Sequence, residues 1–273
     1  MYGKTHLGGN QVNQTFVRQV FCSQGYRGSF ASVTLCSNLS EFNDSTHLQS
    51  RALSTGCAAT AFVYCQIDGP HLIRWFSPYS EIQFCGHATL AAADVLITAI
   101  NTRQGALHFS SASHSICVKR VTSGHYVMLL PQCTLRASLD LPDVAKIFSE
   151  EVTNFHYTEP DDGYLVAQVP NRDHVANFDF ASDRYCKLTR RALLITAQDA
   201  SQPNTVYFRY FAPQYGSKED AATGSAAPLL AAFWQLPINR TLKCYQLSSH
   251  GAFYRISQSD LEVSVFASVQ TPL

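Results

Sequence analysis

Two short glycine-centred segments carry the side chains best suited to chemistry, Cys85-Gly86-His87 and Thr223-Gly224-Ser225. A thiol or an imidazole can accept or deliver a proton, and an imidazole can also orient a ligand oxygen. Each segment runs into an apolar, alanine-rich stretch that is typical of a buried helix, and a helix start favours an anion. Two such starts facing each other would hold a small carboxylate substrate, with Asp220 as the best carboxylate of the second half.

The same residues also have a structural explanation. Gly86 and Gly224 can simply permit tight turns, with Thr89 and Ser225 as helix caps. The thiol can be a small buried hydrophobe, and the imidazole and the carboxylate can be ordinary core or surface groups. A single glycine segment favours this structural explanation, whereas the occurrence of two matching segments favours a functional one.

The two segments belong to an internal repeat. The pentapeptide RWFSP at 74–78 returns as RYFAP at 209–213, an offset of 135 residues, and the glycines follow at an offset of 138. In each copy a β-branched and aromatic run that ends in proline predicts a strand, and the alanine-rich stretch predicts a helix. The repeat therefore predicts two pseudo-symmetric halves, each with a buried helix.

Around the repeat the chain is mostly β. Further strands are expected at 12–22, 32–36, 61–67, 115–121, 126–130, 163–169, 192–197, 253–256 and 261–266, and helices at 43–55 and 142–148. A break in the pattern around 131–143 divides the chain into two lobes. We expect an N-terminal lobe over 1–131, to which the C-terminal strand can cross back, and a C-terminal lobe over 132–273.

Composition removes several classes of function. Lys plus Arg and Asp plus Glu both number 20 among 273 residues, so the net charge is zero and nucleic acid or anionic lipid is a disfavoured partner. Nine cysteines without a C-x-x-C pair predict neither a zinc ribbon nor a disulfide framework. The N-terminus has no apolar segment of the secretory kind, and the longest apolar run, 88–100, is too short for a membrane span. A cytoplasmic location is expected, and the nucleotide-binding, zinc-protease and esterase motifs are absent from the sequence.

The two blocks, RWFSPYSEIQFCGHATLAAA and RYFAPQYGSKEDAATGSAA, resemble the signature loops of the phenazine-biosynthesis isomerase-like (PhzF-like) family, which is related in fold to diaminopimelate epimerase. Weaker agreement extends over nearly the whole chain. The resemblance implies an α+β fold of two lobes, each a mostly antiparallel sheet or barrel around a central helix, with the active site in the cleft between them. It also implies an enzyme without metal or organic cofactor, a small-molecule substrate and a homodimer.

Carried over by position, the family's catalytic His and Asp fall at His87 and Asp220 and its second-loop hydroxyl at Ser225. Gly86 and Gly224 would supply backbone donors to the substrate carboxylate. The further site residues that the matching segments imply are Cys85, the first-loop thiol of the epimerase relatives, Thr223, Ala59 and Tyr79. Thr223 stands where those relatives have a second thiol, so one-sided proton transfer is expected rather than two-base racemisation.

The resemblance breaks at the position of the family's catalytic Glu. That Glu usually stands in an S-E-T-x-F context, which here reads AATAF at 58–62, so its place is taken by Ala59, and the usual G-N-P reads GSF at 28–30. Natural divergence is favoured over an engineered replacement because the neighbouring residues differ as well. We expect an isomerase or cyclase of specialised metabolism that acts on a small unsaturated carbonyl or carboxylate compound. Two alternatives remain open: a cyclase that only folds its substrate, and a non-catalytic ligand-binding protein.

Overall fold

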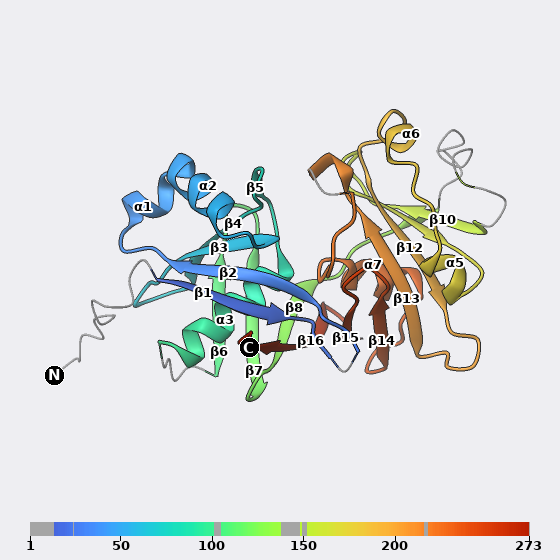
Figure 1. Cartoon of the computed structure of the whole chain (residues 1–273). Coiled ribbons are helices and arrows are strands. Elements are labelled where there is room, and N and C mark those ends of the chain that lie inside the picture. The colour runs from blue at the N-terminus through green and yellow to red at the C-terminus, as the bar shows by residue number, and fades with distance from the viewer. Residues whose placement is uncertain are drawn as a thin grey trace. The chain divides into compact units, whose positions relative to one another are not determined.

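A computed structural model describes residues 14–23, 25–100, 105–137, 148, 152–215 and 218–272. The chain separates into two compact units (Figure 1). Unit 1 comprises the chain up to Val20, Ser29–Met128 and the chain from Ala267 onward, and unit 2 comprises Phe21–Gly28 and Leu129–Phe266. Two strands, β8 (His125–Pro131) and β16 (Glu262–Gln270), therefore contribute residues to both units.

Unit 1 is built on strands in the order β1-β2-β3-β4-β6-β7-β8-β16. β1 also pairs with β16, where Val20 lies opposite Val269, so the strand order closes on itself as a barrel. The strands are β1 (Thr15–Val20), β2 (Ser29–Leu35), β3 (Ala59–Tyr64), β4 (His71–Phe76), β6 (Ala106–Ser110), β7 (Ser115–Thr122), β8 (His125–Pro131) and β16 (Glu262–Gln270), with the short β5 (Glu81–Ile82) paired to β4.

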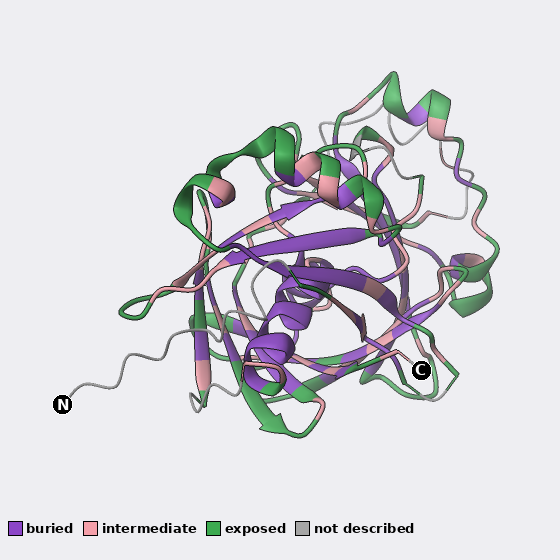
Figure 2. Cartoon of the chain, turned by 60° about the vertical axis from the view of Figure 1, so that its left-hand side comes forward, coloured by how far each residue is buried: buried purple, intermediate pink, exposed green. Residues whose placement is uncertain are grey.

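The helix α3 (Gly86–Thr98) packs against β1, β2 and β3 and is buried from Gly86 to Ile97 (Figure 2). Its alanines let the strands approach closely, since a larger side chain would push them away. One polar group anchors it: Asp94 accepts hydrogen bonds from Arg18 and, at 2.6 Å, from the Tyr126 hydroxyl, and all three are buried. A buried carboxylate needs such partners, so the triad fixes the position of α3 along the barrel.

Two short helices, α1 (Leu39–Asn43) and α2 (Ser45–Ser54), cover the outer face of unit 1. They connect β2 to β3 and bury Phe42, Leu48 and Ala52 against Phe62 and Phe76. Unit 1 thus has a helix inside its sheet and a pair of helices outside it.

Unit 2 repeats this plan. Its strands are β9 (Arg136–Ala137), β10 (Asn154–Tyr157), β11 (Tyr164–Gln168), β12 (Ala192–Gln198), β13 (Thr205–Phe211), β14 (Thr241–Gln246), β15 (Ala252–Gln258) and the first part of β16, paired in the order of their numbers. The buried helix α7 (Ala226–Phe233) packs against β15, after a single 3-10 turn at Pro213–Tyr215. The outer helices α5 (Arg172–Ala176) and α6 (Ser182–Cys186) connect β11 to β12.

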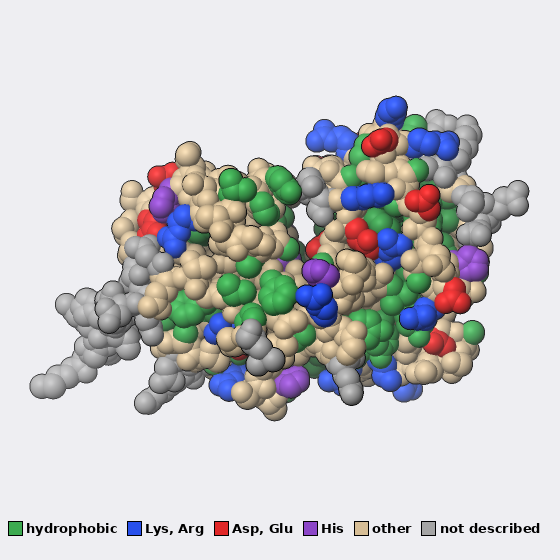
Figure 3. Space-filling model, in the orientation of Figure 1, with side chains coloured by type: hydrophobic (Ala, Val, Ile, Leu, Met, Phe, Trp, Pro, Cys, Tyr) green, Lys and Arg blue, Asp and Glu red, His purple; other side chains and the backbone are tan. Residues whose placement is uncertain are grey.

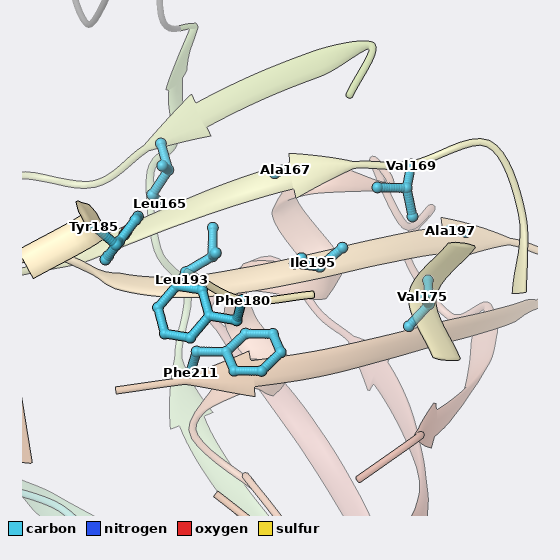
Figure 4. Close-up of a cluster of buried hydrophobic side chains, with 10 residues drawn as sticks. All are labelled: Leu165, Ala167, Val169, Val175, Phe180, Tyr185, Leu193, Ile195, Ala197 and Phe211. Atoms are coloured by element: carbon cyan, nitrogen blue, oxygen red, sulfur yellow. The ribbon is translucent and has the colours of Figure 1, made fainter. Parts of the chain in front are cut away.

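The outer helices of unit 2 cover an apolar cluster on the sheet (Figure 4). Val175 of α5, Tyr185 of α6 and Phe180 between them pack against Ile195 and Phe211. The rings of Phe180 and Phe211 stack with their centroids 4.5 Å apart. This cluster is the counterpart of the one beneath α1 and α2.

The pairing of strands shows that the sequence repeat is a structural repeat. β2 is parallel to β3, β3 antiparallel to β4, and β4 parallel to β6. In the same order, β11 is parallel to β12, β12 antiparallel to β13, and β13 parallel to β14. The predicted α+β fold with two related lobes, each wrapped around a central helix, is confirmed.

Each strand expected from the sequence overlaps an observed one, and the helix expected at 43–55 is α2, preceded by α1. The helix expected at 142–148 lies outside the described residues except for Phe148. β5, β6, β9, β10 and β14 were not predicted. β5 and β9 have two residues each and β10 has four, whereas β6 and β14 alternate apolar and polar side chains, a pattern that is typical of a half-buried strand. α5 and α6 were missed because a helix of five polar-rich residues leaves no periodic pattern.

On the face drawn in Figure 3, acidic and basic side chains are interspersed rather than gathered by sign. Among the described residues, no helix combines the length and apolar character that crossing a bilayer requires.

Candidate active site

The first glycine segment places a thiol and an imidazole side by side at the start of α3. Cys85 is the residue before the helix, and its Sγ lies 3.4 Å from Nδ1 and 3.7 Å from Nε2 of His87. Both residues are buried, at 7% and 6% exposure. A thiol in contact with an imidazole can exchange a proton with it, which is the basis of acid–base and nucleophilic Cys–His pairs.

Thr89 is not a helix cap. Its hydroxyl donates to the Cys85 carbonyl oxygen at 2.7 Å, which is an internal bond of the first turn, and α3 has no side-chain cap at Cys85. The first-turn N–H groups are thus not occupied by a capping side chain. This is the arrangement that suits a helix start to an anion.

Ala59 and Tyr79 have different environments in unit 1. Ala59 begins β3, is 1% exposed, and lies opposite Ala31 of β2. Tyr79 stands in a turn where the Ser77 hydroxyl accepts its backbone N–H at 3.1 Å, and its side chain is 71% exposed. Ala59 is therefore a buried apolar group, while Tyr79 projects to solvent.

In the second glycine segment, Asp220 is held by its own loop. Thr223 donates its hydroxyl to Asp220 Oδ2 at 2.7 Å, and the Thr223 side chain is almost fully buried. Gln246, with no exposed surface, accepts the Thr223 backbone N–H at 2.7 Å and donates through Nε2 to the Asp220 carbonyl oxygen at 2.6 Å. The carboxylate is thus fixed by a threonine that is itself fixed by a glutamine.

Two further side chains bind the backbone of this loop. Tyr254 donates its hydroxyl to the Thr223 carbonyl oxygen at 3.1 Å, and Ser248 donates to the Ala221 carbonyl oxygen at 2.7 Å. Burial, with smaller contributions from Cys244 and Asp220, raises the pKa of Tyr254 well above its usual range. The phenol therefore remains a donor throughout the physiological pH range.

Ser225 precedes α7 with helical backbone angles, φ −65° and ψ −15°, and its side chain makes no capping bond. The suggestion that Thr89 and Ser225 serve as helix caps is therefore wrong for both residues. A cap requires extended backbone so that the hydroxyl can turn back to the helix N–H groups, and Ser225 does not have it. Its half-buried hydroxyl stands one residue after Gly224.

Matching Arg–Glu pairs anchor both segments. In unit 1, Arg74 donates from Nε and Nη2 to Glu81 at 2.8 and 2.7 Å; in unit 2, Arg209 donates from the same atoms to Glu219 at 2.7 and 2.9 Å. Each arginine also donates from Nη1 to a carbonyl oxygen in the last turn of an outer helix, Phe42 of α1 or Ala176 of α5. Each lies over the phenylalanine two residues further along its strand. Glu219 directly precedes Asp220, so the second pair fixes the start of the carboxylate loop.

Four residues of the second segment's surroundings were not predicted: Gln246, Ser248, His250 and Tyr254. They lie on β14, β15 and the turn between them, more than twenty residues after Asp220, and no motif in the sequence marks them. The pairing of Gln246 with Ala252 on adjacent strands brings this group to the loop.

A groove of about 670 Å³ lies beside the first segment in unit 1. Its walls come from α1, β4, β5 and the loop after β6, and include Trp75, whose indole N–H is buried without a partner among the described residues, and the 110–113 serine-rich loop. The groove reaches Gln83 but not Cys85 or His87. Among the described residues, no group of three or more His, Cys, Asp and Glu side chains lies close enough together to hold a metal ion.

Comparison with known sequences identifies relatives along most of the chain. A human phenazine biosynthesis-like domain-containing protein is 28% identical over 89% of this chain and 90% of its own length. A protein of Pseudomonas aeruginosa named as an uncharacterized isomerase is 30% identical over 83% of each chain.

Solved structures agree on the fold. A PhzF-family phenazine biosynthesis protein of Enterococcus faecalis superposes with a TM-score of 0.80 over 94% of this chain and 95% of its own, at 24% identity. A hydroxyproline epimerase of Agrobacterium vitis, with trans-4-hydroxy-L-proline bound, has a TM-score of 0.58 at 9% identity, covering 95% of this chain and 91% of its own. The family model described as phenazine biosynthesis-like protein (PhzC-PhzF) matches residues 18–271, and the chain belongs to this family.

Proposed function

We propose that the protein is a cofactor-independent isomerase, or a cyclase, that acts on a small unsaturated carboxylate or carbonyl compound with groups of its two glycine segments. The observation that carries the proposal is the doubled design of the site. Each segment combines a helix start that has no side-chain cap with a group that can carry a proton. In the first segment this group is the Cys85–His87 pair, in contact at 3.4 Å, and in the second it is Asp220, which accepts a hydrogen bond from Thr223 at 2.7 Å. Relatives named as isomerases and an epimerase with the same fold support the reaction class.

The substrate carboxylate or carbonyl oxygen is held by backbone N–H groups at Gly86 and Gly224, where the helix dipoles favour negative charge. Such donors stabilise the enolate-like charge that develops when a proton leaves the adjacent carbon. Because Asp220 uses Oδ2 to accept from Thr223, Oδ1 is the oxygen assigned to the proton. The proton is returned at another carbon of the conjugated system by Asp220, or by His87 with Cys85 beside it, so the double bond moves without any redox change.

Ala59 makes this mechanism differ from the proton shuttle that the family resemblance implies. The resemblance implies a catalytic carboxylate at this position, and a methyl group carries no proton. The proton must therefore travel by Asp220, His87 or Cys85. The buried methyl also makes this part of the site apolar, which suits the conjugated carbon chain of an unsaturated carboxylate or carbonyl substrate of specialised metabolism.

A second candidate function follows from the same observation. An apolar site can fold a reactive substrate for ring closure, with His87 and Ser225 polarising a carbonyl group and no proton transferred by the protein. If the site binds a ligand and forms no product, the protein is a binding protein on an enzyme fold.

We further propose a homodimer, which sedimentation velocity would detect.

Solvent exchange separates these functions. The protein is incubated in heavy water with a panel of small unsaturated carboxylates, and deuterium uptake and product formation are followed by NMR. For an isomerase we expect uptake into at least one compound, and a fall of at least about tenfold in Asp220→Ala and in His87→Ala, since acid–base groups contribute about 10²- to 10⁴-fold. The exposed residues Asp260 and His47 provide the matched controls Asp260→Ala and His47→Ala.

The outcomes are distinct. Product without deuterium uptake, unaffected by Asp220→Ala and His87→Ala, supports the substrate-folding cyclase. Saturable binding with neither uptake nor product supports the binding protein.

A further inference from the structure

His250 stands in a turn that is bonded to the Asp220 loop. The turn connects β14 to β15, and Gly251 donates its N–H to the Ser248 carbonyl oxygen at 3.0 Å with φ +66°. The Ser248 hydroxyl in turn donates to the Ala221 carbonyl oxygen at 2.7 Å, one residue after Asp220. His250 is thus the titratable side chain of a turn that is fixed directly to the carboxylate loop.

The turn is also held from its other side. Arg27 donates its backbone N–H to the His250 carbonyl oxygen at 2.9 Å, and Gly28 donates to the Gly251 carbonyl oxygen at 2.7 Å. A Cβ atom at Gly251 would lie 2.6 Å from Cδ1 of Tyr26, so no larger residue fits there without moving that ring. Gly28 begins the segment where the family's usual G-N-P is altered. The turn that carries His250 is therefore bonded to this segment on one side and to the Asp220 loop on the other.

The environment of the ring determines where its hydrogen resides. Nδ1 is buried and has no hydrogen-bond partner in the described part of the chain. A hydrogen on Nδ1 would be a buried donor without an acceptor, which is unfavourable because the N–H loses its hydrogen bond to water and gains none. An unpaired acceptor is tolerated more readily, so the neutral ring carries its hydrogen on Nε2. Because His250 as a whole is only half-buried, Nε2 is the nitrogen that a ligand can reach.

We infer that His250 is a substrate-polarising residue of the second segment's site, whose Nε2–H donates to a carbonyl or carboxylate oxygen of the substrate. Asp220 moves the proton, and His250 stabilises the charge that forms on the oxygen. A neutral imidazole with its hydrogen on the ligand side is a donor and not a base. This role rests on the proposed function, because it assigns one more residue to the same site.

The substitution test exploits the geometry of glutamine. In His250→Gln the side-chain amide nitrogen can take the place of the imidazole Nε2, whereas His250→Leu removes the donor at similar volume. With a compound that exchanges deuterium, we expect His250→Leu to lower the exchange rate by about 10²-fold, as for removal of an oxyanion donor, and His250→Gln to stay within about fivefold of wild type. An unchanged rate in His250→Leu, or an equal loss in both variants, would overturn the inference. The exposed His125 supplies the control His125→Leu, and thermal unfolding checks that each variant is folded.

A second measurement needs no substrate. Nitrogen-15 NMR of the full chain at pH 8, where an ordinary histidine is neutral, reports which ring nitrogen carries the hydrogen. We expect the Nε2–H form for His250, and a shift of its Nε2 signal on addition of benzoate as a simple carboxylate probe. An Nδ1–H form, or an Nε2 signal that does not move as benzoate is added up to its solubility limit, overturns the role of His250. Failure of every compound to exchange deuterium would instead contradict the proposed isomerase, while the NMR result still decides the tautomer.

Discussion

Arg209 and Glu219 are joined by two parallel hydrogen bonds, from Nε to Oε1 at 2.7 Å and from Nη2 to Oε2 at 2.9 Å, and Arg74 and Glu81 repeat the pair in unit 1. In both units the arginine also binds the end of an outer helix. The pair therefore connects the outer layer to the segment that leads into the inner helix. Each glycine segment is thus held in place by its own Arg–Glu pair.

Loss of the paired hydrogen bonds from Arg209 to Glu219 should make the Asp220 loop less ordered. Arg209→Lys keeps the charge but cannot make both bonds and the carbonyl contacts at once, so we expect a loss of about 1.5 to 3 kcal/mol in the free energy of unfolding. Hydrogen–deuterium exchange should rise over 218–225. The exposed Arg184 provides the control Arg184→Lys, which should change neither quantity. Unchanged exchange in Arg209→Lys would show that the pair does not anchor the loop.

Gln246 should be required for the order of the same loop by a different route. Gln246→Leu has nearly the same volume but leaves the Thr223 N–H and the Asp220 carbonyl oxygen without their partner. At about 1 to 3 kcal/mol for each unsatisfied buried group, we expect a loss of about 3 kcal/mol, measured by chemical denaturation. Gln198, whose side chain is exposed, gives the control Gln198→Leu with a change of less than about 1 kcal/mol. A similar small change in both variants would contradict the assigned role of Gln246.

The repeat could be recognised in the sequence because each of its signals comes from residues that are close together in the chain. Proline ends each aromatic strand, glycine starts each inner helix, and the Arg74 and Arg209 blocks lie on comparable strands, so the two-lobed fold was predictable. Gln246 and His250 were not, because their importance arises from strand pairing that brings them to a loop more than twenty residues away. The burial of Ala59 and the exposure of Tyr79 depend on packing and likewise have no sequence signature.

The cysteines should divide sharply by reactivity. Burial raises the pKa of Cys65 and of Cys133 from 9.0 to about 11, and that of Cys36 to about 12. Because the thiolate is the reactive form and its fraction falls as the pKa rises, Cys65 and Cys133 should carry about 100-fold less thiolate at pH 8 than a thiol of pKa 9.0. Their alkylation by iodoacetamide should increase about tenfold per pH unit up to about pH 10, while the exposed Cys186 is modified first.

Mass spectrometry of peptides after timed labelling measures each site separately. Labelling in denaturant provides the control, since unfolding removes the burial that raises the pKa, and all the sites should then react at similar rates. Rapid labelling of Cys65 at pH 8 in the folded protein would contradict the expected effect of burial.

Ala59 occupies the position where the family resemblance fails. Restoring the acid with Ala59→Glu should not restore a family-type proton shuttle, because Ala59 is buried on β3 between β2 and β4 and the neighbouring residues have changed with it. A larger side chain there costs about 1 to 3 kcal/mol through overpacking, and burial of its charge adds to that. Ala59→Gln has the same shape without the charge, so the difference in unfolding free energy between the two variants isolates the cost of the carboxylate. If Ala59→Glu were as stable as wild type and gained deuterium exchange activity that Ala59→Gln lacks, the position would still be a working acid site, and the divergence would lie in that one residue.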